Sequence, residues 1–308
     1  MSIKIITDAS SNLFPEILKN KNLDIKILPM QLELKDKHYL CYDSQIDASK
    51  LSSEFYQEMI QGAKPKTSLV SPGLMEDVIS EEVKKGNKVI YVSIAKHISG
   101  NYQAANLVAE EINSEYGEEY VHVIDSLTAS FGEAMVAIYA YELTKQNLDF
   151  KEICQKTEEY VLSVRSEFTC NSIKYLANTG RVSSFAAALA SVLAIKPLLY
   201  GSPQGKIEVT SKVHGRMGAL KTLANQVIEN IKDQKGKVYI AHSDSLKDAE
   251  FVASKLKEAG IDDIEIYYYD LVTGAHVGPG TIACFYEGVN RDFNKASIIK
   301  NVLSKIKK

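Results

Sequence analysis

Strand-like and helix-like segments alternate along the first half of the chain, and this alternation is the strongest constraint on its fold. Short apolar, β-branched runs occur at Ile3–Thr7, Lys88–Ala95 and Glu119–Ile124. After the second of these runs, Asn101–Asn113 carries apolar residues at the three- and four-residue spacing of one helical face. Strands that alternate with helices in this way form a parallel, doubly wound sheet with flanking helices. Ligands of such sheets bind outside the carboxyl ends of the strands.

The turn within Lys96–Gln103 is the first candidate binding site, because it closes a strand and opens a helix. Ser99 and Gly100 lie in this turn. A hydroxyl group, a glycine that lets a ligand approach the backbone, and the free N–H groups of a helix start together suit an anion. The alternative interpretation is that Ser99 only caps the helix, which is a common role for serine.

The loop Lys64–Gly73 contains a second candidate. Ser71 is the expected N-cap of the next helix and Pro72 its first residue. Thr67 and Ser68 then have no capping role, which makes them candidates for binding a ligand. A solvent-facing loop without a binding role is the alternative.

The other segments of the N-terminal region complete an α/β domain over residues 1–160. The small polar residues 8–12 are expected to cap a helix that begins at Pro15. Residues 23–30 and 31–34 are predicted strands, 36–47 a polar turn, 48–61 a helix, and 129–143 a helix buried on most sides. The loops after residues 7, 67, 95 and 124 are expected to share one edge of the sheet.

The pattern changes near residue 160, which predicts a second, α+β domain over residues 161–290. Two strand-like runs flank the turn Gly201–Gly205, and this predicts an antiparallel hairpin. Further strands are expected at 166–170, 238–242, 264–269 and 281–286. Helices are expected at 173–177, 185–194 and 215–233, and a further helix after the strand at 238–242 is expected to end at 259. Residues 291–308 are predicted to form a basic amphipathic tail, which packs on the body or contacts a membrane surface transiently.

Composition excludes several classes of function. The net charge is −3 and the pI near 6.1, so a nucleic-acid partner is not expected. The four cysteines are far apart, the first residues lack a signal-peptide core, and no apolar run approaches the length that spans a bilayer. We therefore expect a soluble, reduced, cytoplasmic protein.

Familiar catalytic motifs are not found. Gly278–Ala283 has the letters of a dinucleotide fingerprint, but it runs into a strand-like segment instead of a helix. No phosphate-binding loop, nucleophile elbow or histidine pair at metal-ligand spacing occurs, so we expect no metal site and no self-sufficient kinase or hydrolase. His276 is a further candidate, since nearby glycines are expected to hold it on a tight loop.

Five short motifs together resemble one known family. In chain order they are Lys66-Thr67-Ser68, Ile98-Ser99-Gly100-x-Tyr102, Gly180-Arg181-Val182-Ser183, Ile195-Lys196-Pro197 and His276-x-Gly278-Pro279-Gly280-Thr281. Their combination resembles the DegV family, whose members bind fatty acids, over roughly residues 3 to 288. The resemblance implies two domains with one long-chain fatty acid, such as palmitate, between them and no cofactor. It also implies a non-catalytic carrier that presents the carboxylate to a separate ATP-dependent fatty acid kinase, which makes an acyl phosphate for phospholipid synthesis.

The resemblance also assigns roles to residues. Thr67 and Ser99 correspond to the hydroxyl groups that bind the carboxylate in this family, with Gly100 beside them, and Arg181 and His276 match residues near the head group. By the same resemblance, a basic patch that meets the kinase is expected to include Arg216. Asn101 departs from the pattern, because threonine is usual at this position. A rival from another class is a stand-alone phosphotransferase or hydrolase that uses Ser99 with His276.

Overall fold

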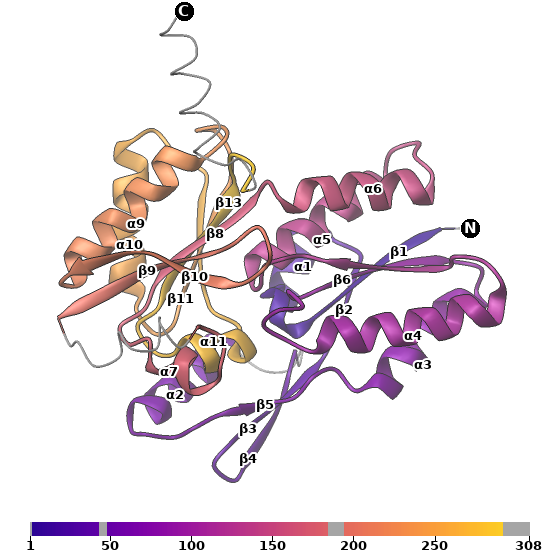
Figure 1. Cartoon of the computed structure of the whole chain (residues 1–308), viewed down its shortest axis with the longest axis horizontal. Helices are drawn as coiled ribbons and strands as arrows, with labels where there is room; N and C mark the ends of the chain where they lie inside the picture. The colour runs from indigo at the N-terminus through magenta and orange to yellow at the C-terminus, as the bar shows by residue number, and fades with distance from the viewer. Residues whose placement is uncertain (1, 43–47, 184–193, 292–308) are drawn as a thin grey trace, which may run out of the picture.

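The chain folds into two lobes that lie side by side, each built around its own sheet (Figure 1). The computed structural model describes residues 2–42, 48–183 and 194–291. The predicted helix at 185–194 lies outside these ranges except for its last residue, and the predicted tail lies outside them from residue 292 onward. Among the described residues, no helix combines the length and the apolar character needed to cross a bilayer.

The N-terminal lobe contains a parallel sheet, as predicted. Its strands have the order β2-β1-β6-β7 and span Ile25–Leu28, Ile3–Asp8, Lys88–Ser93 and Val121–Asp125. All neighbouring pairs run parallel. Strand β6 is buried beyond its first residue, because helices cover both faces of the sheet. Helices α1, α3, α4, α5 and α6 span Pro15–Lys21, Pro72–Lys84, Asn101–Tyr116, Phe131–Thr144 and Phe150–Val161.

Helix α5 is buried on most sides, as its apolar composition predicted. It contacts both lobes. At its start, the Phe131 ring stacks on Tyr239 of the C-terminal lobe, with the ring centroids 4.8 Å apart. Burying a phenylalanine side chain contributes about 1.5–3 kcal/mol to stability, compared with leaving it exposed. This helix therefore fixes the position of the two lobes relative to each other.

A small antiparallel sheet lies below the two lobes in Figure 1 and has the order β4-β3-β5. Its strands span Lys37–Cys41, Met30–Leu34 and Lys66–Thr67. The prediction of a turn over 36–47 is therefore wrong at its start, because β4 pairs with β3 across a tight turn in which Lys35 has a φ of 55°. An edge strand with exposed polar side chains has the composition of a loop. Thr67 also lies in this sheet and not at the end of a parallel strand.

The C-terminal lobe contains a mixed sheet, as predicted. Its strands have the order β10-β9-β8-β13-β11-β12 and span Ile207–His214, Ile195–Gly201, Val164–Thr169, Ile282–Glu287, Val238–His242 and Ile264–Tyr268. Only the pair of β11 and β12 runs parallel among these neighbours. The predicted hairpin is confirmed as β9 and β10. Helices α2, α7, α9, α10 and α11 span Ala48–Ile60, Lys174–Asn178, Arg216–Asn230, Leu246–Glu258 and Leu271–Val277.

Two further local predictions are wrong. His276 lies in helix α11 and not on a tight loop, because the Asp270 side chain accepts the Thr273 N–H and caps this helix. The polar residues 8–12 do not cap the helix at Pro15. Asp8 instead caps a short 3₁₀ helix, η1, at Ala9–Ser11.

Candidate functional site

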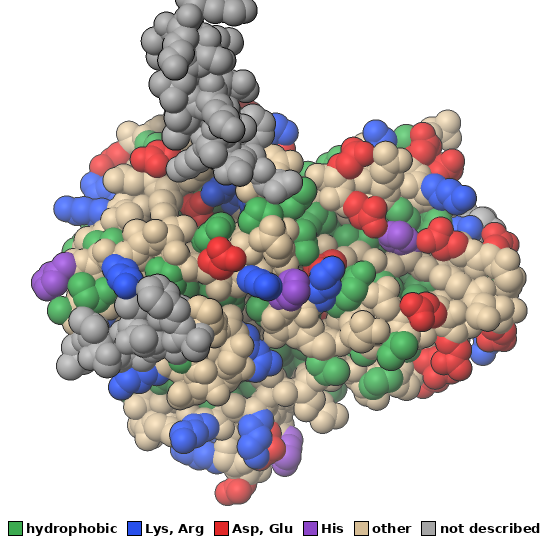
Figure 2. Space-filling view, viewed as in Figure 1, with side chains coloured by type: hydrophobic (Ala, Val, Ile, Leu, Met, Phe, Trp, Pro, Cys, Tyr) green, Lys and Arg blue, Asp and Glu red, His purple; other side chains and the backbone are tan. Residues whose placement is uncertain are grey.

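A cavity lies where the two lobes meet. It encloses about 950 Å³ of empty space, including the part that is open to solvent. Hydrophobic side chains are visible along this junction in Figure 2. The apolar wall comes from the small sheet, from the loops after β6 and β7, from β8, β10 and β13, and from α7 and α11: Met30, Ile94, Leu127, Phe168, Leu176, Ile207, Val277 and Phe285. The volume is in the range of sites that hold small organic ligands.

The predicted site residues line the same cavity. Thr67, Ser99, Gly100, Arg181 and His276 all belong to its wall, although they come from β5, the loop after β6, the turn after α7, and α11. Four separate segments thus converge on one place. The polar groups and the apolar wall give the cavity two chemically different parts.

The turn at Ser99 carries the features predicted for it. The Ser99 hydroxyl accepts the backbone N–H of Asn101 at 3.2 Å, and Gly100 occupies the N-cap position of α4. Gly100 has a φ of −76°, and a Cβ atom there would meet only the Leu69 side chain at 3.8 Å. Neither the backbone nor the packing requires glycine at this position. Its missing side chain leaves room at the cavity mouth.

Thr67 and His276 form a direct pair across the cavity wall. Thr67 Oγ1 lies 2.8 Å from His276 Nε2. Burial and, to a smaller extent, the positive charge of Arg181 lower the pKa of His276 to about 4. The imidazole is therefore neutral at pH 7. Its other nitrogen, Nδ1, is buried and makes no hydrogen bond within the described part of the chain.

Arg181 contributes a positive charge beside Ser99 and His276. Its Nε donates to the Ile98 carbonyl at 3.2 Å, and Nη1 donates to the Thr179 carbonyl. The first of these bonds ties the turn after α7 to the segment that precedes Ser99. Partial burial lowers the pKa of Arg181, yet an arginine stays protonated at neutral pH. The guanidinium therefore supports an anion at this end of the cavity.

Arg216 lies away from these residues and does not line the cavity. Its guanidinium forms an ion pair with Asp248, with Nη2 and Oδ2 2.8 Å apart, and donates to the Gly280 carbonyl at 2.7 Å. These contacts join α9 to α10 and to the turn before β13. The surroundings of Arg216 therefore give it a role within the C-terminal lobe, and its expected role in a partner contact stays a prediction.

Three buried acids near the cavity were not predicted as site residues. Asp8 and Glu133 are 0% exposed, and Asp270 is 3% exposed. Burial raises the pKa of Asp8 to about 6 and of Asp270 to about 8, and it raises the pKa of Glu133 well above its usual range. One signal was available in the sequence, because Glu133 lies among the apolar residues at the start of α5, whereas the other acid of this helix, Glu142, lies in its last turn.

The buried acids share an ordered set of hydrogen bonds. Ser10 Oγ bonds to Asp8, and it also lies 3.0 Å from Glu133 Oε2. Thr7 Oγ1 donates to Glu133 Oε1 at 2.7 Å. A hydroxyl has one hydrogen, so Ser10 donates to Asp8 while a protonated Glu133 donates to Ser10. Asp8 is then the acid of this pair that carries the negative charge.

Within residues 2–42, 48–183 and 194–291, no group of three or more His, Cys, Asp or Glu side chains could hold a metal ion. Asp8 and Glu133 are hydrogen-bonded to hydroxyl and amide groups instead, whereas Asp270 Oδ2 has no hydrogen-bond partner among the described residues.

Fold and site together define a two-lobed α/β protein whose interlobe cavity joins an apolar wall to a cluster of hydroxyl, imidazole and guanidinium groups. The chain belongs to the DegV family, whose model, described as "Uncharacterised protein, DegV family", matches residues 2–288. This confirms the family predicted from the five motifs. A DegV domain-containing protein of Clostridium perfringens is 31% identical over 290 residues, covering 94% of this chain and 98% of that protein.

Solved structures of the same family share the fold. A fatty acid binding DegV family protein from Streptococcus agalactiae has a TM-score of 0.82 and 27% identity, covering 94% of this chain and all of that one. A DegV family protein from Ruminococcus gnavus, solved with vaccenic acid, has a TM-score of 0.78 and 24% identity, covering 92% of this chain and 99% of that one. These likenesses extend over both lobes, and they confirm the predicted fold class.

Proposed function

We propose that this chain binds one long-chain fatty acid, such as palmitate, in the interlobe cavity. One observation carries this proposal: an apolar cavity wall that also presents Thr67, Ser99, Arg181 and His276. Such a cavity matches an apolar tail that ends in a carboxylate. The Streptococcus agalactiae relative, described as fatty acid binding, supports the same ligand class.

The acyl tail supplies most of the affinity. A C16 chain has about 14 methylene groups, and their burial at about 0.8 kcal/mol each contributes on the order of 11 kcal/mol. Losses of translational and conformational freedom remove several kcal/mol or more of this sum. The carboxylate loses hydration when it binds. Hydrogen bonds from the protein can replace the lost hydration.

The hydrogen bonds of the polar residues can be arranged for a carboxylate. If His276 Nε2–H donates to Thr67 Oγ1, the Thr67 hydroxyl keeps its own hydrogen for the ligand. The Ser99 hydroxyl already accepts from Asn101, so its hydrogen also points elsewhere. Two hydroxyl donors and the Arg181 charge would then hold the two carboxylate oxygens.

The carboxylate end of the proposed site lies where the protein is exposed. Ser68, Leu69 and Gly100 line the cavity and are exposed to solvent. A second protein can therefore approach the head group. We propose that an ATP-dependent fatty acid kinase does so: a carboxylate oxygen bonds to the γ-phosphorus while the bond from that phosphorus to ADP breaks. The chain would hold the oxygen in line and would not be catalytic alone.

The rival, a hydrolase or phosphotransferase that uses Ser99 and His276, has less support. A serine nucleophile needs a base within hydrogen-bond reach. His276 bonds to Thr67, and its pKa of about 4 makes it a weak base at neutral pH. The carrier function accounts for the same residues without a base.

Two measurements test the proposal. Mass spectrometry of an organic extract of the purified protein should detect a long-chain fatty acid in about equal amount to the protein. With ATP and the kinase subunit added, the chain should support formation of an acyl phosphate, and without the kinase it should form none. An extract free of fatty acid, together with no palmitate binding in calorimetry, would refute the proposal.

The proposed location is the cytoplasm, with transient membrane contact when the acyl phosphate is passed to phospholipid synthesis. Cell fractionation should place the protein in the soluble fraction, with a small share on membranes that rises when product accumulates. Constant and tight membrane association would contradict this location.

A further inference from the structure

The two hydroxyl groups of the proposed head-group site belong to different sheets. Thr67 lies on β5 of the small antiparallel sheet, and Ser99 follows β6 of the parallel sheet. A carboxylate is small, so both hydroxyls can donate to it only if the distance between the two turns is held constant. The structure places the Asn101 side chain between these turns, and that side chain is 0% exposed.

Every hydrogen-bonding group of the Asn101 amide has a partner. Its Oδ1 accepts the Val70 backbone N–H at 3.2 Å. Its Nδ2 has two hydrogens and donates to Asp8 Oδ2 at 2.7 Å and to the Tyr91 hydroxyl at 3.0 Å. The backbone donor on one side and the acidic acceptor on the other leave only one orientation for the amide.

These bonds connect the Thr67 turn to the core of the N-terminal lobe. Val70 follows the Thr67 turn, whose Leu69 side chain also lies over Gly100. On the other side, Asp8 is held by Ser10 and by the network of hydroxyl groups around Glu133 in the core. Buried networks whose members are all satisfied favour a single arrangement. The Thr67 turn is thus fastened to the same core element that carries the Ser99 turn.

We propose that Asn101 is a positioning residue: it sets the separation of the Thr67 and Ser99 hydroxyls and so makes the site selective for a carboxylate head group. This inference rests on the proposed function. It predicts that Asn101 affects the head group of the ligand and not its tail. Palmitate and hexadecanol separate the two effects, because they share the same tail length and differ in the head group.

The experiment compares both ligands on Asn101→Ala, Asn101→Thr and Asn113→Ala variants of the full chain. Asn113 is the matched control, because it lies on the same helix and its side chain makes hydrogen bonds of 2.8 to 2.9 Å to the backbone of Tyr120 and Val121, far along the helix from the head-group turn. Asn101→Ala should weaken palmitate binding by about tenfold or more, while hexadecanol binding changes by less than about threefold. Asn113→Ala should lower stability and leave the ratio of the two affinities unchanged.

Asn101→Thr keeps the protein testable if the alanine variant fails to fold. Its single oxygen can bond to Asp8 but cannot also accept from Val70. Because threonine is usual at this position in the family, the ratio of affinities should fall, but by less than in Asn101→Ala. Combining Asn101→Thr with Thr67→Val should cost less than the sum of the two single changes, because both act on the same turn. Equal weakening of palmitate and hexadecanol, or unchanged palmitate binding, would overturn the inference.

A ligand-free measurement keeps this inference separate from the proposed function. Hydrogen exchange at the Val70 amide should accelerate in both Asn101 variants and stay slow in Asn113→Ala. If the wild-type protein binds no fatty acid, the proposed function fails, and exchange at Val70 still decides whether Asn101 fastens the two turns. Slow exchange at Val70 in every variant would reject the role of Asn101.

Discussion

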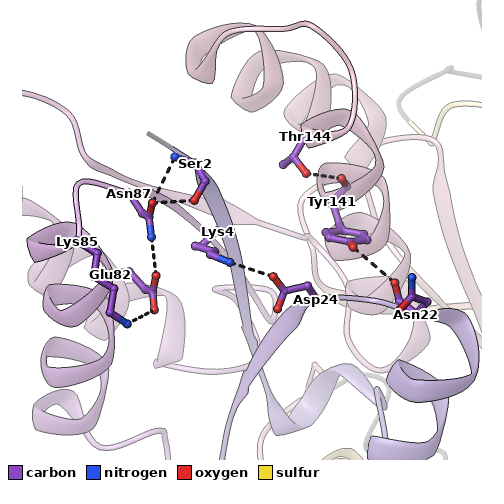
Figure 3. Close-up of polar contacts among 9 residues, drawn as sticks. All are labelled: Ser2, Lys4, Asn22, Asp24, Glu82, Lys85, Asn87, Tyr141 and Thr144. Atoms are coloured by element: carbon purple, nitrogen blue, oxygen red, sulfur yellow. Dashed lines mark hydrogen bonds and ion pairs between the residues drawn. The ribbon is translucent and has the colours of Figure 1, made fainter.

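The two ends of the parallel sheet use similar polar residues in opposite ways. At the amino end, Lys4 pairs with Asp24 at 2.9 Å, and the Ser2 hydroxyl donates to Asn87 at 2.7 Å (Figure 3). The side chains of Lys4 and Asp24 are 35% and 75% exposed. At the carboxyl end, Asp8 of the same strand is 0% exposed. Water can replace each contact at the first end, whereas only the protein can satisfy the groups at the second.

This difference in burial determines how much each polar contact contributes to stability. An exposed ion pair contributes about 0–1 kcal/mol, so its loss changes little. A buried polar group without a partner costs about 1–3 kcal/mol, more if charged, so each member of the carboxyl-end network is needed by the others. Ser99 and Asn101 belong to that second region. The proposed head-group site is therefore held by contacts that tolerate little change.

Replacing Glu133 should produce the largest effect. Glu133→Ala leaves the Thr7 hydroxyl without its buried partner, removes one of the partners of Ser10, and opens a cavity in α5. We expect a loss of about 3–5 kcal/mol in the free energy of unfolding, measured by urea denaturation. Glu133→Gln should retain most of the stability, because the carboxyl group is already neutral when folded. A Glu133→Ala protein as stable as the wild type would remove the distinction between the two ends.

The paired hydroxyls should have the next largest effect, on binding. Thr67→Val combined with Ser99→Ala removes two donors to the proposed carboxylate and keeps the shape of Thr67 within β5. Palmitate affinity should fall at least about a hundredfold, because each of the two lost hydrogen bonds to a charged group contributes about 1.5–3 kcal/mol. Calorimetry gives the affinity, and circular dichroism checks that the fold is intact. Wild-type affinity in this double variant would reject the assigned roles.

The pH dependence of stability tests the buried acids. The folded pKa of Asp270, about 8, exceeds its ordinary value of 3.8, so the native state keeps a proton that the unfolded chain releases. Stability should therefore fall as pH rises from 6.5 to 8.5, with a slope of up to about 1.4 kcal/mol per pH unit from this group. His276 stays neutral in this window. Asp270→Asn should reduce the slope by the part that Asp270 contributes, and an unchanged slope would contradict the shifted pKa of Asp270.

The amino end should show the smallest effect. Lys4→Ala removes the exposed pair with Asp24 and should change the free energy of unfolding by less than about 0.5 kcal/mol. The change should shrink further in high salt, because salt screens exposed charges. Urea denaturation at two salt concentrations measures both quantities. A loss in the free energy of unfolding as large as that of Glu133→Ala would show that exposure does not decide how much a polar contact contributes at the two ends.

Several parts of the molecule could be predicted from local patterns. The parallel strands, the Ser99 turn and the β9–β10 hairpin follow from periodicity and turn residues, which act over a few neighbours. Helix α6 carried an unused signal, since Asp149 and Glu152 form a capping box at its start. Turn and loop chemistry also indicated Ser99, Thr67 and His276 as candidates, whereas Arg181 came from the motifs of the DegV family.

Helix α11 shows why local patterns were not enough. Gly274 suggested a loop around His276, yet it lies within the helix. A Cβ atom at this position would come within 1.9 Å of the Tyr56 hydroxyl, so the glycine makes room for a side chain from another element. The local sequence around position 274 does not indicate that contact.

Periodicity, turn chemistry and family motifs are properties of the linear chain, and they predicted most element types, the mixed and parallel sheets, and the residues of the proposed head-group site. The convergence of those residues, the neutral His276 and the role of Asn101 depend on the folded molecule. Thr7 and Glu133, for example, are separated by 126 positions and meet only in the core. Burial and hydrogen bonding set the charge of each group there, and both arise when distant segments exclude water together.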